Sequence, residues 1–98
     1  MYEEWSGVPN AEIHISITLT GNGLPPSLAS IQIYADGKES THTGVFLPHQ
    51  VLGAGHFYCK TSAGFTIRYD EYLGEATLED VPKHLQPCYY SVRFTNKP

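Results

Sequence analysis

Hydrophobic and polar residues alternate along several short stretches of this chain. In residues 11–20, three isoleucines and Leu19 take every second position, and polar residues fill most of the positions between them. Period-two alternation of β-branched residues is typical of a strand with one buried and one exposed face. Five further segments carry the same kind of pattern: 29–35, 56–61, 64–69, 76–78 and 88–95.

Turn signals separate these segments. Asp36 and Gly37 follow the second strand candidate and strongly indicate a two-residue hairpin turn. The return strand is expected over 38–43, where polar residues on both faces suit the edge of a sheet. We expect the apolar residues of 45–47 to return to the core, and 62–64 to form a second hairpin turn.

The spacing of strands and turns predicts the fold class. Six or seven short strands, with turn signals every 8–12 residues or so, predict an all-β fold, an antiparallel β-sandwich of the Ig-like or Greek-key type. At most one short helical turn is expected near 81–86, because Pro82 suits a first helical position. We expect one domain over residues 1–98, with 1–10 as a mobile or loosely packed N-terminal segment.

The net charge of the chain limits the classes of partner that it is expected to bind. The net charge is −4, and the six Lys and Arg residues are scattered. A nucleic-acid backbone or an anionic membrane surface would favour clustered basic residues, so we expect neither as a partner. Residues 1–12 show no basic segment followed by an apolar one, and we therefore expect a small acidic protein in the cytoplasm.

The two cysteines, Cys59 and Cys88, are not part of a CxxC pair. Both fall on apolar strand faces, and because no signal peptide is visible we interpret them as buried free thiols rather than as a disulfide. A buried thiol has a raised pKa and is unreactive. Nucleophile-elbow, phosphate-loop and nucleotide-binding patterns are absent from the sequence as well. The chain is therefore predicted not to be an enzyme and to need no cofactor.

Candidate metal ligands lack the spacing that a metal site needs. The five histidines show no local ligand motif, so no metal site is expected. The segment 70–80 is acidic and contains no Lys or Arg, but it lacks the pattern of a calcium loop. We interpret it as a solvated rim, with an acidic docking patch for a basic partner as the other interpretation.

Tyrosine and arginine recur on the strand faces that would point outward. Both residue types anchor protein interfaces, because each combines a large contact area with a directional hydrogen bond. Tyrosine is also favoured at exposed strand positions without any role in binding, which is the competing interpretation. We expect five of these side chains to form a partner-binding sheet face: Tyr34, Tyr58, Arg68, Tyr89 and Arg93.

These features favour a non-catalytic protein-binding module of the inhibitor, immunity or anti-defence, or accessory-subunit type. Its partner would be another protein, bound through the sheet face or an exposed strand edge, and the chain would be a monomer or a weak homodimer. A carbohydrate-binding β-sandwich module is the alternative, because aromatic faces pack against sugar rings. A small metal-dependent or thiol enzyme, with Cys59 beside His56 or His84, is the second alternative.

Overall fold

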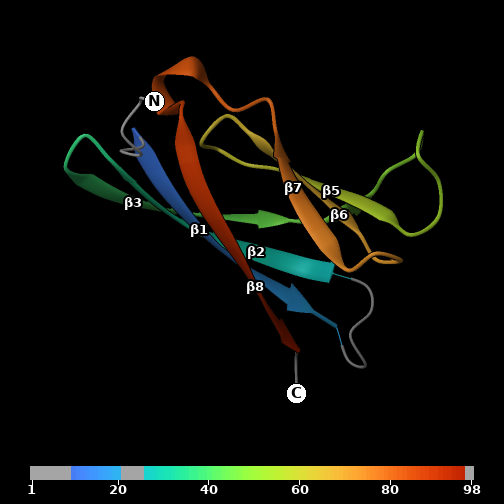
Figure 1. Cartoon of the computed structure of the whole chain (residues 1–98). Coiled ribbons are helices and arrows are strands. Elements are labelled where there is room, and N and C mark those ends of the chain that lie inside the picture. The colour runs from blue at the N-terminus through green and yellow to red at the C-terminus, as the bar shows by residue number, and fades with distance from the viewer. Residues whose placement is uncertain (1–9, 21–25, 97–98) are drawn as a thin grey trace.

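The computed structural model describes residues 10–20 and 26–96, and its strands form two four-stranded sheets (Figure 1). In sheet A the order β3-β2-β1-β8 corresponds to Lys38–Val45, Pro26–Ala35, Ala11–Leu19 and Cys88–Asn96. In sheet B the order β4-β5-β6-β7 corresponds to Leu47–Pro48, His56–Lys60, Thr66–Asp70 and Glu75–Glu79.

The all-β prediction is confirmed, and the strand count differs from the expected six or seven. The described residues form eight strands, one of which, β4, is only two residues long. Their one helical element is a single 3-10 turn at Lys83–Leu85, inside the segment 81–86 where a turn was expected. No helix in the described ranges is long and apolar enough to cross a membrane.

One strand pair corrects the expectation of a wholly antiparallel fold. β8 runs parallel to β1, and Ala11 lies opposite Cys88 at the start of the ladder (Figure 1). After β7 the chain leaves sheet B, passes through the 3-10 turn and re-enters sheet A at the end where β1 begins. The backbone N–H of Asn10 donates to the carbonyl of Pro87 over 2.8 Å and opens this pairing.

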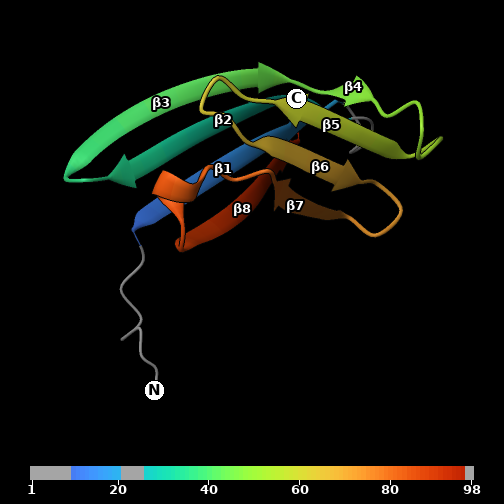
Figure 2. The ribbon, with the colours of Figure 1, turned by 90° about the horizontal axis from the view of Figure 1, so that it is seen from above.

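The predicted β2–β3 hairpin is confirmed, with β3 at the edge of sheet A. Asp36 and Gly37 have φ values of 54° and 72°, the positive pair that a type I′ turn requires. The chain then continues through Phe46 into β4 of sheet B (Figure 2). Of the apolar residues 45–47 only Phe46 is buried; Val45 and Leu47 are exposed, because neighbours in an extended chain point to opposite sides.

The hydrophobic core lies between the two sheets. Its residues come from alternate positions of β1, β2, β5 and β6, as the sequence pattern predicted, together with Phe46, Phe65 and Leu85. Side chains of this size each contribute about 1.5–3 kcal/mol when fully buried. The largest of those with almost no exposure are Phe65, Ile13, Ile15, Ile17, Ile31, Ile67 and Cys59.

Two further expectations concern the cysteines and the N-terminus. Both thiols are free; Cys59 is fully buried, and Cys88 is half-buried at the start of β8. The expectation of a mobile segment over 1–10 lies outside the described residues except for Asn10. That residue is held by its backbone bond to Pro87 and by a bond from its side-chain amide to the carbonyl of Gln86.

Candidate functional site

Strand alternation turns one face of sheet A away from the core, and we call it the outer face. The pairing registers align its residues in four rows that cross the sheet from β3 to β8. The rows are Glu39, Tyr34, Glu12 and Tyr89; Thr41, Gln32, His14 and Ser91; Thr43, Ser30, Ser16 and Arg93; Val45, Leu28, Thr18 and Thr95.

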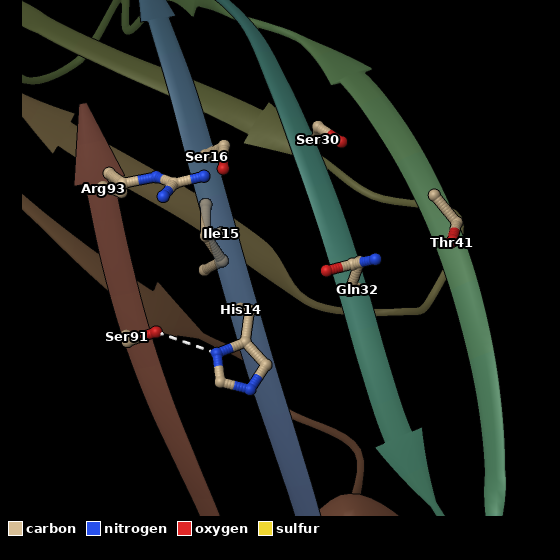
Figure 3. A pocket seen from close by; sticks show the side chains of 8 residues that line it. All are labelled: His14, Ile15, Ser16, Ser30, Gln32, Thr41, Ser91 and Arg93. Carbon is tan, nitrogen blue, oxygen red and sulfur yellow. Dashed lines mark hydrogen bonds between the residues drawn. The ribbon is translucent and has the colours of Figure 1, made fainter. Parts of the chain in front are cut away.

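The two middle rows enclose a shallow hollow of about 340 Å³ (Figure 3). Apart from Ile15, the residues that line it are polar and come from all four strands: His14, Ser16, Ser30, Gln32, Thr41, Ser91 and Arg93. Figure 3 shows these polar side chains on the same side of the sheet, with sheet B behind it. The hollow therefore offers several hydrogen-bond donors and acceptors at a surface that the core does not use.

His14 is the most strongly positioned side chain of this hollow. Its Nδ1 lies 3.0 Å from the hydroxyl of Ser91, the residue opposite His14 in the parallel β1–β8 ladder (Figure 3). Its Nε2 lies 3.7 Å from a carboxylate oxygen of Glu12, and its ring meets the Tyr34 ring edge-on, with the centroids 5.7 Å apart. The imidazole thus links β8, β1 and β2.

The two arginines of the predicted binding face have different surroundings. Arg93 reaches from β8 across β1 toward Ser16, and no residue in the described ranges forms an ion pair with it (Figure 3). Arg68 is paired with Glu79 on the neighbouring strand β7. The guanidinium of Arg93 is therefore the better placed of the two to receive a carboxylate from a partner.

The five predicted binding residues fall on two surfaces. Tyr34, Tyr89 and Arg93 share the outer face of sheet A, whereas Tyr58 and Arg68 lie opposite each other on the outer side of sheet B. The latter two line a separate hollow of about 360 Å³. Alternation along a strand predicts which residues face outward, but it does not say which sheet the strand joins.

The structure does not bring Cys59 and His56 together as the second alternative, a thiol enzyme, would require. Cys59 points into the core, where burial raises the pKa of its thiol and disfavours the reactive thiolate. His56 lies on the opposite side of β5, with Nδ1 3.9 Å from a carboxylate oxygen of Asp70. Among the described residues, no group of three or more His, Cys, Asp or Glu side chains is arranged to hold a metal ion.

The alternation over residues 11–20 puts His14 at one of the polar positions of that strand, but it does not connect His14 with Ser91 or Arg93. The connecting signal is the pairing of β1 with β8, which joins residues 77 positions apart in the case of His14 and Ser91. Alternation in each strand contains no information about this neighbour. The alternation of apolar and polar residues therefore could not predict this hollow.

Comparisons with known proteins do not add a precedent for this site. No protein-family model, curated protein or solved structure matches the chain.

Proposed function

We propose that this chain is a non-catalytic protein-binding module of the inhibitor, immunity or anti-defence, or accessory-subunit type, and that it acts through the outer face of sheet A. In this proposal the architecture is a β-sandwich of the Ig-like or Greek-key type, in which sheet B supports the contacting sheet from behind. The module works in the cytoplasm without a cofactor, as a monomer or a weak homodimer.

The proposal rests on the residue composition of the outer face of sheet A, which takes no part in the hydrophobic core. Three of its side chains, Tyr34, Tyr89 and Arg93, belong to the types that dominate interface hot spots. Tyr89 is 60% exposed and Tyr34 is 40% exposed, so a partner covering the face would bury substantial ring area. A carboxylate of the partner would complete the hydrogen bonding of Arg93.

The hollow specifically favours one alternative, a carbohydrate-binding module. Its volume of about 340 Å³ lies at the lower end of the range for small-molecule sites. Hydroxyl, amide, imidazole and guanidinium groups in its wall can hydrogen-bond to sugar hydroxyls. Tyr34 and Tyr89 in the adjacent row offer ring faces against which a sugar ring can pack.

A comparison of three baits tests the proposed function. Full-length wild type, the double variant Tyr89→Ala/Arg93→Ala and the control Tyr58→Ala are incubated with lysate of the source cells. Bound proteins are then quantified by mass spectrometry. We expect the double variant to lose a partner that wild type recovers by at least about tenfold, because one hot-spot side chain often contributes about 2 kcal/mol. Tyr58→Ala removes a tyrosine from sheet B and should recover the partner as wild type does.

The other outcomes separate the remaining functions. Equal recovery by all three baits would contradict a contact through the outer face. Binding to a glycan array that Tyr89→Ala abolishes, without any protein partner, would favour the carbohydrate-binding alternative. Rapid labelling of Cys59 in the native chain, or stoichiometric zinc in the purified protein, would favour the enzyme alternative.

A further inference from the structure

Two loops at one end of the molecule expose large apolar side chains. The loop 49–55 between β4 and β5 carries Val51 and Leu52, and the loop 71–74 between β6 and β7 carries Tyr72 and Leu73 (Figures 1 and 2). Val51, Tyr72 and Leu73 are 87%, 72% and 67% exposed, more than any other large hydrophobic residue in the described ranges. We call these four residues the loop-tip patch.

Hydrogen bonds to backbone and side-chain acceptors hold both loops in place. The N–H of Glu71 donates to the carbonyl of Gly55 over 2.9 Å and ties one loop to the other. Oδ1 of Asp70 accepts the N–H groups of Tyr72 and Leu73 over 2.9 and 3.2 Å. The Tyr72 ring packs against Gly55 so closely that a β-carbon there would come within 2.2 Å of it. Because the backbone of both loops is already fixed by these contacts, it loses little conformational entropy when a partner binds.

The surroundings of the loop-tip patch are acidic. Asp70, Glu71 and Glu75 lie in or beside the second loop, and neither loop contains Lys or Arg. Lys60 lines the hollow beside Val51, where Asp80 balances its charge. The nearby Arg68 is neutralised by its ion pair with Glu79. Anionic lipid headgroups would be repelled by this charge, whereas a basic protein segment would be attracted.

A hollow of about 280 Å³ lies beside the two loops, and both apolar and acidic side chains line it. Leu52 and Leu73 form apolar parts of its wall, and Asp70 and Glu75 contribute carboxylates. His56 and Arg68 also line it, but the charge of Arg68 is already paired with Glu79, so the two carboxylates leave the hollow acidic. A long basic side chain suits this arrangement, because its aliphatic stem can pack on the leucines while its charged end meets the carboxylates. The acidic segment 70–80 therefore has apolar side chains within and beside it.

We propose that the loop-tip patch docks a protein segment in which large apolar side chains are flanked by lysine or arginine, with one basic side chain entering the hollow. This surface is separate from the outer face of sheet A. It does not depend on the function proposed for that face.

A random peptide library displayed on phage tests this proposal with the full chain as the immobilised target. Selected peptides are synthesised, and their affinities are measured by fluorescence anisotropy. We expect them to combine leucine or aromatic residues with an excess of Lys and Arg over Asp and Glu. The double variant Val51→Ser/Leu73→Ser should weaken binding by about tenfold or more, and Glu75→Lys by about fivefold. All three positions are exposed, so the variants should keep the wild-type circular dichroism spectrum.

Leu28→Ser/Val45→Ser is the matched control, because it makes the same change at two exposed apolar residues on the outer face of sheet A. We expect it to bind the selected peptides as wild type does. Peptides without a basic excess, or peptides that bind Val51→Ser/Leu73→Ser as tightly as wild type, would overturn the proposal. Binding of the chain to phosphatidylserine–phosphatidylcholine vesicles, if that variant abolished it, would overturn it in favour of a membrane. Results for Tyr89→Ala/Arg93→Ala bear only on the function of the outer face.

Discussion

At the scale of single residues, Gly44 of β3 and Cys59 of β5 meet where the edge of sheet A approaches sheet B. A β-carbon at position 44 would come within 2.3 Å of the Cys59 sulfur. Because Cys59 is fully buried, its sulfur has little room to move aside. The absence of a side chain at position 44 therefore allows the two sheets to approach at this edge.

We expect Gly44→Ala to lower the free energy of unfolding by about 1–3 kcal/mol, the usual cost of overpacking a core. Urea denaturation of the wild type and the variant measures this loss. In a background that already carries Cys59→Ala, the sulfur is gone, and the same substitution should cost much less. An equal cost in both backgrounds would contradict the steric explanation.

At the scale of elements, the turn between β2 and β3 shows how local chemistry fixes a hairpin. Asp36 and Gly37 both adopt positive φ, a conformation that costs most L-residues about 1–2 kcal/mol. Gly37→Val should therefore destabilise the chain by about this amount, whereas Gly37→Asn should be tolerated because asparagine enters this region more readily. Thermal unfolding of the two variants checks the difference. Equal melting temperatures for both would show that the turn conformation does not limit stability.

Local signals also explain how much of the fold could be predicted. The inward positions of β1 and β2 and the turn at Asp36 and Gly37 depend on neighbours in sequence, and the structure confirms them. The pairing of β8 with β1 joins distant segments and depends on how the chain returns from sheet B. Alternation in β8 is the same whether its neighbour is parallel or antiparallel, so the sequence pattern could not specify this pair.

At the scale of the whole molecule, the candidate site was predicted in part. Tyr34, Tyr89 and Arg93 come together on one face, while Tyr58 and Arg68 lie on the other sheet. The residue types were visible in the sequence, but their division between sheets required the strand order. The loop-tip patch was missed because its apolar side chains stand in short loops, where alternation has no meaning. Apolar residues beside turn glycines were the signal that could have indicated it.

The measurement that tests the central claim most directly is site-specific photo-cross-linking in the source cells. Benzoylphenylalanine, which carries a photoreactive benzoyl group where tyrosine has its hydroxyl, replaces Tyr34, Tyr89 or Tyr58 one at a time in the full chain. We predict that the substitutions at Tyr34 and Tyr89 give the same cross-linked partner protein and that the substitution at Tyr58 gives none, because it lies on sheet B. A protein adduct from Tyr58 alone, or from none of the three positions, would contradict a partner contact through the outer face of sheet A.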